Sequence, residues 1–366
     1  MKLSIVREDI LKPLHQVAGV VERRQNLPIL SNVLLRSANG VLTLTGTDLE
    51  VELVTRIPME GGEPGEITLP ARKLLDIVRA LPEGAQISLE VDGEKARLRS
   101  GRSRFVLATL PAAEFPTVDD IASPLELALT QGGLRRLIER TQFAMAQQDV
   151  RYYLNGLMLE LTPQSLRAVA TDGHRLATCV LAEDVGVSEE RQVIVPRKAV
   201  VELRRLLEEE GGSVRLQLGD NHIRILLDNV VFTSKLIDGK FPDYRRVIPE
   251  GGTVRVVADR EALHQAFVRA SVLSNEKYRG MRLALTDGLL QARVHNPEQE
   301  EAEEELEVDY SGPQFEIGFN VAYFLDALSV IPSEQVRIEM TDANSSCLVQ
   351  GEGEDSCKYV IMPMRL

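Results

Sequence analysis

The sequence predicts three α+β domains of one kind, arranged one after another along the chain. The first reason is length, because 366 residues at about 150 residues per domain suit two to three domains. The second is an internal repeat, in which three separate markers recur at intervals of 124 to 126 residues. This register predicts domains over 1–124, 125–250 and 251–366. The markers are the segments PARKLLDIVRAL (70–81), PRKAVVELRRLL (196–207) and NVAYFLDALSVI (320–331); the pairs Thr47-Asp48, Thr171-Asp172 and His295-Asn296; and the pairs Phe115-Pro116 and Phe241-Pro242.

Two amphipathic helices are expected in each repeat. In the segment 70–81, Leu74, Leu75, Val78 and Leu81 recur at helical spacing. A segment of the same kind opens each repeat. These segments are REDILKPLHQVAGVV from Arg7, QGGLRRLIERTQFAMA from Gln131 and DREALHQAFVRASVL from Asp259.

Short runs with a period of two fill the rest of each repeat and predict strands and hairpins. Examples are VLTLTG and VELVTRI in the first repeat, LMLEL and VRLQLG in the second, and LLQARVH and VRIEMT in the third. Because strands outnumber helices, we expect antiparallel sheets with two helices packed on one face in every domain.

The composition excludes several classes of protein. Hydrophobic residues make up 44% and charged residues 27%, which is typical of globular chains and not of disordered ones. A net charge of −13 argues against tight DNA binding by the whole surface. With no Trp, 7 Tyr and 9 Phe, the chain has few rings on which single-stranded bases could stack.

The cysteines and the N-terminal residues favour a cytoplasmic protein. Three cysteines, Cys179, Cys347 and Cys357, are too few for a disulfide scaffold, and an odd count suits a reducing compartment. Cys347 and Cys357 lack the spacing of a metal knuckle and are interpreted as ordinary thiols. Charges interrupt MKLSIVREDILKPL where a signal peptide has an apolar run, and no stretch approaches 18 apolar residues.

Charge is distributed unevenly along the chain. The six expected helices carry an excess of Lys and Arg, whereas the strands and loops carry the excess of acid. One interpretation is solvated helix faces with scattered ion pairs. The other is a basic surface that follows phosphates while the acidic remainder repels DNA. No helix-turn-helix, zinc-finger or basic-zipper motif is present, so any DNA contact is expected to involve the backbone only.

Three segments are candidates for chemistry or binding. The run TDGHRLA places Asp172 near His174, which suits a metal-dependent hydrolase with Asp48, or else a turn in which Asp bonds backbone amides. The acidic run PEQEEAEEE (297–305) is either solvated or a docking surface for a basic partner. The apolar end KYVIMPMRL either closes the third sheet or lines a groove. No phosphate-binding loop and no hydrolase motif occurs, so we expect no catalytic residues, no metal and no cofactor.

The whole chain resembles the bacterial sliding clamp, the β subunit of the replicative DNA polymerase holoenzyme. The resemblance implies three domains of the DNA clamp fold and a head-to-tail homodimeric ring. The segments that carry it are LPILSNVLL (27–35), LTGTDLE (44–50), GRSRFVLATLPAAEFP (101–116), QDVRYYLNG (148–156), ATDGHRLA (170–177), VPRK (195–198), FPDYRRVIP (241–249), LSNEKYRG (273–280), NPEQEEAEE (296–304) and the terminal MPMRL.

The resemblance also implies site residues. The dimer interface would use Phe105 and Leu107 against Val272 and Leu273, with Lys73 facing Glu298 and Glu300. DNA would meet Arg24, Arg72, Gln148, Tyr152 and Tyr153. A groove for a partner peptide with Gln and two apolar anchors would be formed by Arg151, Tyr153, Leu154, Thr171, Gly173, His174, Arg175, Leu176, Pro242, Arg246, Val247, Asn320, Tyr323, Val360, Met362, Pro363, Met364 and Arg365.

The implied function is a non-enzymatic clamp that encircles double-stranded DNA without sequence specificity and tethers the replicative polymerase. Its other implied partners are the clamp loader and further polymerases. No membrane association is expected. Two alternatives stay open: the hydrolase that uses Asp48, Asp172 and His174, and a static DNA-compacting protein with tight, steeply salt-dependent binding.

Overall fold

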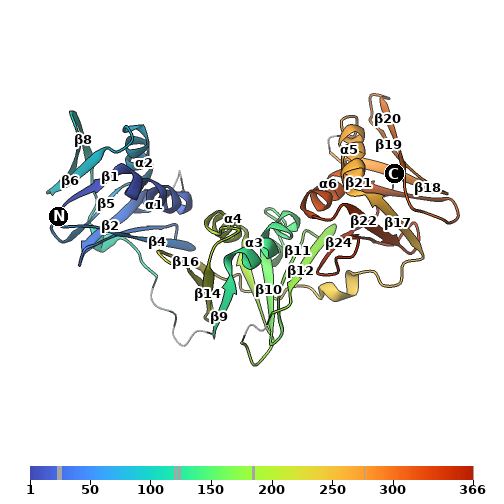
Figure 1. Ribbon diagram of the computed structural model, residues 1–366, viewed down its shortest axis with the longest axis horizontal. Coiled ribbons are helices and arrows are strands. Elements are labelled where there is room, and N and C mark those ends of the chain that lie inside the picture. Colours follow the sequence, from blue (N-terminus) through green and yellow to red (C-terminus); the bar gives the residue numbers. More distant parts are fainter. Residues whose placement is uncertain (23–26, 119–120, 122–124, 184–185, 276, 366) are drawn as a thin grey trace. The chain divides into compact units, whose positions relative to one another are not determined.

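The computed structural model describes residues 1–22, 27–118, 121, 125–183, 186–275 and 277–365. Within these residues there are six α-helices, each lying where the hydrophobic periodicity predicts one (Figure 1). The helices are α1 (Arg7–Val20), α2 (Ala71–Ala80), α3 (Gln131–Glu139), α4 (Arg197–Leu206), α5 (Arg260–Ser271) and α6 (Val321–Val330).

The strands follow the same repeat: one strand, a helix, four strands, a second helix and three strands. In the first repeat they are β1 (Lys2–Val6), β2 (Asn32–Ala38), β3 (Val41–Thr47), β4 (Val51–Pro58), β5 (Gly65–Pro70), β6 (Gln86–Asp92), β7 (Lys95–Ser100) and β8 (Ser103–Ala108). In the second they are β9 (Leu125–Thr130), β10 (Gly156–Thr162), β11 (Ser165–Thr171), β12 (Arg175–Leu181), β13 (Arg191–Pro196), β14 (Ser213–Leu218), β15 (His222–Leu226) and β16 (Val230–Lys235). In the third they are β17 (Val254–Asp259), β18 (Gly280–Thr286), β19 (Leu289–His295), β20 (Glu301–Glu307), β21 (Phe315–Asn320), β22 (Gln335–Met340), β23 (Cys347–Gly351) and β24 (Cys357–Ile361).

Consecutive repeats share their sheets, a feature that the sequence did not predict. One eight-stranded sheet has the order β5-β2-β3-β4-β16-β15-β14-β9, and the other has the order β13-β10-β11-β12-β24-β23-β22-β17. Two four-stranded sheets, β1-β6-β7-β8 and β20-β19-β18-β21, complete the described set. The antiparallel pairing expected from the sequence is confirmed for these neighbours, including β4 with β16 and β12 with β24. Edge strands carry unpaired backbone groups, so pairing two edges satisfies both sets.

The chain divides into two compact units that follow these shared sheets. Unit 1 comprises Met1–Gln131 and Val201–Leu236, and unit 2 comprises Gly132–Val200 and Ile237–Leu366. Each unit contains one eight-stranded and one four-stranded sheet. The second repeat therefore contributes strands to both units.

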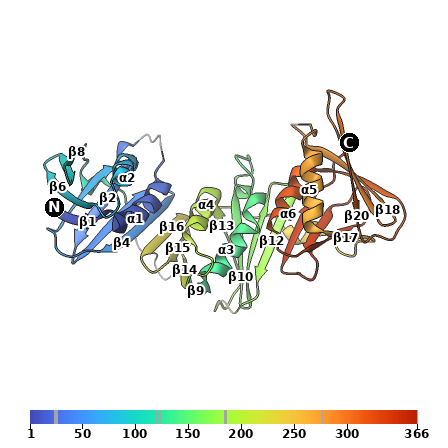
Figure 2. The same ribbon diagram turned by 45° about the horizontal axis from the view of Figure 1, so that its top comes forward.

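Two pairs of helices pack against the sheets of their own repeat. Figure 2 shows α1 beside α2 and α5 beside α6, and both pairs are in contact. In α2, Leu74 and Val78 are buried whereas Arg72 and Lys73 are exposed. Burying the apolar stripe stabilises the helix and leaves its basic face in solvent.

The first helix of the second repeat is shorter than its apolar pattern suggests. Helix α3 ends at Glu139, and a 3₁₀ turn, η3 (Gln142–Ala144), follows it. The Thr141 hydroxyl donates to the Leu137 carbonyl oxygen at 2.6 Å, and the Ala144 N–H bonds the Thr141 carbonyl in the tighter i to i+3 pattern.

Equivalent positions of the repeat form equivalent hydrophobic clusters. In unit 1, Leu30 and Phe115 pack in one cluster; in unit 2, Leu154 and Phe241 belong to another. The members of each pair lie 124 and 126 residues apart, in the register that the sequence markers define. The repeat is therefore a repeat of cores as well as of strands.

The prediction that Cys357 is an ordinary thiol is wrong, because Cys357 forms a disulfide with Cys179. The two residues lie directly opposite each other on β24 and β12. They are 178 residues apart in the chain, so spacing alone could not reveal that they meet. Cys347 is a free, buried thiol, as interpreted, and burial raises its pKa.

None of the helices within the described residues has the length and apolar character needed to span a membrane.

Candidate functional site

A groove with a volume of about 180 Å³ lies in unit 2. Its walls come from a 3₁₀ turn, η4 (Tyr152–Leu154), the β11–β12 turn, a second 3₁₀ turn, η5 (Tyr244–Val247), and the end of β24. Its lining is mainly apolar at the floor and polar at the rim. The lining residues are Arg151, Leu154, Thr171, Gly173, His174, Arg175, Leu176, Pro242, Asp243, Tyr244, Val247, Ser346, Val360 and Met362.

Most residues proposed from the resemblance meet in this groove. They come from segments far apart in the sequence, and tertiary folding brings them together. The proposed residues that line the groove are Arg151, Leu154, Thr171, Gly173, His174, Arg175, Leu176, Pro242, Val247, Val360 and Met362.

Other proposed groove residues lie beside the lining. Tyr153 packs against the hydrophobic cluster that includes Leu154, and exposed Arg246 forms an ion pair with Asp243 at 2.9 Å. The C-terminal segment, with Pro363, Met364 and Arg365, follows Met362 beyond β24. The Met364 N–H donates to the Gly318 carbonyl oxygen of β21 at 2.7 Å, so this segment is held along that strand.

The turn between β11 and β12 is held by its own side chains. The Thr171 hydroxyl donates to the Arg175 carbonyl oxygen at 2.6 Å. One Asp172 oxygen accepts from the backbone N–H groups of His174 at 2.9 Å and of Arg175 at 3.1 Å. Gly173 has a positive φ of 88°, and a Cβ there would lie 2.9 Å from the Arg151 guanidinium. Thr171 and Asp172 therefore fix the conformation of this turn, and the closeness of Arg151 favours Gly at position 173.

The first repeat contains the same turn. The Thr47 hydroxyl donates to the Val51 carbonyl oxygen at 2.9 Å, and Asp48 accepts from the N–H groups of Glu50 and Val51. The interpretation of both Asp residues as turn residues is confirmed. In the described part of the chain, no group of three or more His, Cys, Asp and Glu side chains is arranged to hold a metal ion.

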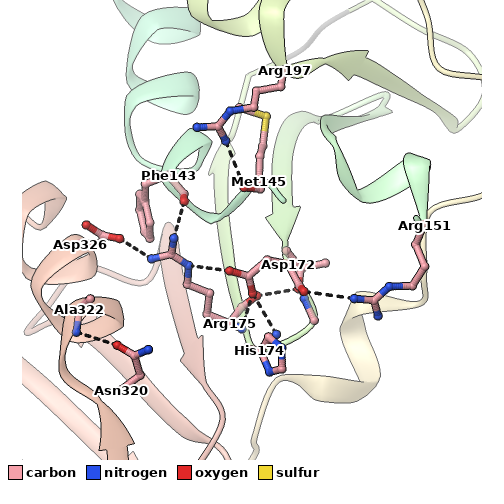
Figure 3. A network of polar contacts seen from close by, with 12 residues as sticks. Phe143, Met145, Arg151, Asp172, His174, Arg175, Arg197, Asn320, Ala322 and Asp326 are labelled. Carbon is pink, nitrogen blue, oxygen red and sulfur yellow. Dashed lines mark hydrogen bonds and ion pairs between the residues drawn. The ribbon is translucent and has the colours of Figure 1, made fainter. Parts of the chain in front are cut away.

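Arg175 is enclosed by partners, as Figure 3 shows. Its guanidinium donates to Asp172 at 3.1 Å, to the Phe143 carbonyl oxygen at 2.7 Å, and to Asp326 of α6. It also stacks over the rings of Phe143 and Tyr323, 5.3 and 4.6 Å from their centroids. With only 13% of its side chain exposed, Arg175 joins the turn to the third repeat instead of offering a free charge.

The start of α6 completes this side of the site. The Asn320 carboxamide oxygen accepts from the Ala322 N–H at 2.9 Å and caps the helix (Figure 3). Burial raises the pKa of Tyr323, which lies under Arg175. Neither residue is part of the groove lining; Tyr323 contacts the lining residue Arg175, and Asn320 caps the helix that carries Tyr323.

Arg151 lies at the rim and pairs with Asp149. Its Nη2 is 2.9 Å from one Asp149 oxygen, and its Nε is 3.0 Å from the other. This bidentate contact with Arg151 lowers the pKa of Asp149 to about 2. Arg151 also donates to the Asp172 carbonyl oxygen at 3.3 Å, so it braces the turn from the opposite side (Figure 3).

Three lining residues were not predicted: Asp243, Tyr244 and Ser346. The first two lie inside FPDYRRVIP, between proposed residues, and that continuity was an available signal. Ser346 belongs to a loop before β23, and nothing in the local sequence marks it.

The residues proposed to meet DNA lie in separate parts of the chain. Arg24 lies outside the described residues. Arg72 is exposed on α2 and lines a cavity of about 420 Å³ in unit 1, together with Arg79 and Arg205. In unit 2, Gln148 and Tyr152 are exposed and Tyr153 is half-buried.

The residues proposed for the dimer interface also differ in exposure. Val272, directly after α5, is 76% exposed, whereas Leu107 on β8 is buried within its own sheet. Leu273 and Phe105 are half-buried, and the charged residues Lys73, Glu298 and Glu300 are exposed.

Models of known protein families match nearly the whole chain. The models of the N-terminal, central and C-terminal domains of the DNA polymerase III beta subunit match residues 1–119, 128–243 and 245–365.

Full-length relatives agree. The chain is 58% identical to the beta sliding clamp of Pseudomonas putida and 52% identical to that of Escherichia coli (strain K12), in each case over 100% of both chains. It also matches solved structures of the Pseudomonas aeruginosa DNA polymerase III subunit beta, one of them bound to griselimycin. These matches have 57% identity and a TM-score of 0.97 over 100% of both chains. The chain therefore belongs to the DNA polymerase III beta-subunit family, the bacterial sliding clamps.

Proposed function

We propose that two copies of this chain close head-to-tail into a ring around double-stranded DNA, and that the groove of unit 2 holds the polymerases. Family membership makes the chain a DNA sliding clamp, a processivity subunit and not an enzyme. The proposal adds the dimer, the DNA contacts, the peptide partners and the three domains over 1–124, 125–250 and 251–366.

The proposal of a dimer rests on two sheet edges that have no strand paired to them in the described part of the chain, although the equivalent strands of the other repeats are paired. The last strand of the second repeat, β16, pairs with β4, and the last strand of the third, β24, pairs with β12. In the first repeat the last strand is β8, which corresponds to β16 and β24. In the third repeat the strand that corresponds to β4 and β12 is β20. Both β8 and β20 are sheet edges within the described residues. A second copy offers each edge the partner that its counterparts already have.

The two existing junctions share one register, which makes the missing one predictable. At both, an aromatic residue of the last strand lies opposite a small or aliphatic residue of the partner strand. The opposed residues are Phe232 with Leu53 in the first junction, and Tyr359 with Ala177 in the second.

The same register can be transferred to β8 and β20. Phe105 faces Leu98 within its hairpin, as Phe232 faces Ile225. Ala302 occupies on β20 the position that Leu53 has on β4 and Ala177 has on β12. The transferred register therefore pairs Phe105 of one copy with Ala302 of the other.

Charge supports this register. It places Arg104 opposite Glu303 and Arg102 opposite Glu305, and all four residues are exposed in the single chain. Oppositely charged pairs facing each other across antiparallel strands contribute roughly 0.2–1 kcal/mol each. Since each copy supplies one β8 and one β20, a dimer has two identical junctions and leaves neither edge open.

Side chains around this junction fit the interface that the resemblance implies. Val272 and Leu273 present apolar surface in the single chain, and we assign them to contact Phe105 and Leu107 of the other copy. Lys73 is assigned to Glu298 and Glu300, which gives the exposed acidic segment a basic partner.

The groove suits an extended peptide with one Gln and two apolar anchors. Leu154, Leu176 and Val360 form an apolar floor, and His174 and Arg151 supply polar groups at the rim. Griselimycin bound to a relative that is 57% identical supports ligand binding in this family. We propose that polymerases and the clamp loader compete for this groove.

Contacts with DNA are proposed to be few and limited to the backbone. Arg72, Gln148, Tyr152 and Tyr153, together with Arg24, are the assigned residues. Each neutralised phosphate contributes about 0.9 to the salt slope, so a small number of contacts leaves the ring free to slide. We place the protein in the cytoplasm, where duplex DNA and the polymerases are.

The test is topological. Protein loaded by a clamp loader onto a nicked circular duplex is expected to stay bound through a high-salt wash and to leave when the circle is cut. Release from the intact circle by salt alone would contradict the ring. Tight binding to short linear duplex with a steep salt slope would instead favour a static DNA-compacting protein.

A further inference from the structure

The groove wall formed by η5 depends on a buried carboxylate outside the groove. The turn carries Tyr244 and Val247 into the lining, although it belongs to neither sheet of unit 2. Tyr244 is buried in the cluster beneath the groove, whereas Val247 is partly exposed at its surface.

Glu160 of β10 is that carboxylate, and 2% of its surface is exposed. Its Oε2 accepts a hydrogen bond from the Tyr244 hydroxyl at 2.7 Å, and its Oε1 accepts from the Arg245 guanidinium at 2.8 Å. Gln192 of β13 donates to Oε1 at 2.7 Å, and Arg167 of β11 lies 3.5 Å from Oε2. A buried carboxylate with this many donors is compensated, and removing it takes an acceptor from each of them, although Arg245 keeps an ion pair with Glu190 at 3.6 Å.

Two consecutive residues of η5 are thereby bound to one acceptor. The Arg245 guanidinium also lies over the Tyr244 ring, 5.1 Å from its centroid. Burial and the bond to Glu160 raise the pKa of Tyr244 to about 12, so the hydroxyl remains a donor at neutral pH. These contacts hold the first residues of the turn whose last residue is Val247.

We propose that Glu160 is a positioning residue for the partner groove: it does not line the groove itself, but through its bond to Tyr244 it sets the positions of Tyr244 and Val247 and so determines how tightly a peptide binds. The inference rests on the proposed function of the groove. It predicts an energetic link between Glu160 and Val247 that does not extend to Met362, which follows β24 and is bonded through its backbone to His174.

A double-mutant cycle tests the link. The probe is a fluorescein-labelled peptide with one Gln followed by Leu and Phe, and its dissociation constant is measured by fluorescence anisotropy on the full-length protein. Glu160→Ala is expected to weaken binding about tenfold, whereas Glu160→Gln, which keeps an acceptor oxygen for only one of Tyr244 and Arg245, is expected to weaken binding less, by about threefold.

The cycle partners separate positioning from general destabilisation. Val247→Ala is expected to cost about fivefold in the unmodified protein and less than about twofold when Glu160 is already Ala. Met362→Ala is the control and is expected to cost the same factor in both backgrounds. If Glu160→Ala does not fold, Tyr244→Phe takes its place, because it removes only the hydroxyl bonded to Glu160.

The outcomes distinguish a failure of the positioning role of Glu160 from a failure of the proposed groove function. Additive losses in both cycles would overturn the positioning role even if Glu160→Ala binds weakly. Failure of the unmodified protein to bind the probe would overturn the proposed groove function, and the positioning role with it.

Discussion

Asp149 and Arg151 form an ion pair at the rim of the groove that is sensitive to acid. The backbone N–H of Arg151 donates to Asp149 at 2.8 Å in addition to the two guanidinium contacts. The pKa of Asp149 is lowered from 3.8 to about 2, so the folded state binds this proton less readily than the unfolded state does. The contribution to stability is therefore present above about pH 4 and is lost as the pH falls towards 2.

Asp149→Asn is expected to lower the melting temperature at pH 5 to 7, and the difference from the unmodified protein should shrink as the pH falls from 4 to 2.5. Thermal unfolding at several pH values measures this. Asp76→Asn, at an exposed position on α2, is the control for the loss of one charge. A difference that stays constant over the whole pH range would show that the ion pair is not its origin.

Residues of the groove differ in how far the sequence could identify them. Leu176 and Val360 were named from motifs, and the structure places both at the groove floor. Tyr244 was missed although it lies among the named residues of FPDYRRVIP, and the bond that holds its hydroxyl comes from Glu160 on β10. Contacts of this kind depend on residues 84 positions apart, which no local pattern marks.

Strand edges are the elements that decide assembly. In the transferred register, Arg102 and Arg104 on one copy face Glu305 and Glu303 on the other. Replacing both arginines by Glu, or both glutamates by Arg, is expected to give a monomer, because like charges facing each other across strands are destabilising.

Mixing the two charge-reversed proteins is expected to restore both junctions of a mixed dimer, one with the native charges and one with the charges exchanged. Light scattering should then report twice the 40.6 kDa mass of one chain for the mixture, and the mass of one chain for each variant alone. Arg36→Glu with Arg56→Glu, at exposed positions on β2 and β4, is the matched control and should remain dimeric. A stable dimer of either reversed variant would exclude this register.

Helices were predictable from sequence in a way that sheets were not. The stripe of Leu74, Leu75 and Val78 identifies α2, because one helix buries one face of its own local sequence. Strand pairing uses backbone groups that every strand carries, so β4 could not be matched with β16 from their side chains alone. The sharing of sheets between repeats therefore became visible only in the structure.

At the scale of the whole molecule, partner binding and ring closure use different parts of the chain. The C-terminal segment is anchored by Met364 to β21, and Met362 lines the groove. The proposed junction strands, β8 and β20, do not include this segment.

Deleting Met364 to Leu366 is expected to weaken binding of the labelled peptide by at least about tenfold, because the anchor that holds Met362 is removed. The mass from light scattering is expected to remain that of the dimer. Deletion of Leu366 alone is the control, since it shortens the chain and leaves the Met364 hydrogen bond to Gly318 in place. Monomers after the deletion would show that this segment also supports the junction.

The repeat, the six helices and the turns around Asp48 and Asp172 follow from the sequence itself, because each rests on residues that are close in the chain. Motif likeness also identified the family. The tertiary structure decided which repeats share a sheet, that Cys179 meets Cys357, and that Glu160 supports the groove wall. These features join residues many positions apart, and only the complete set of packing and hydrogen-bonding partners selects them.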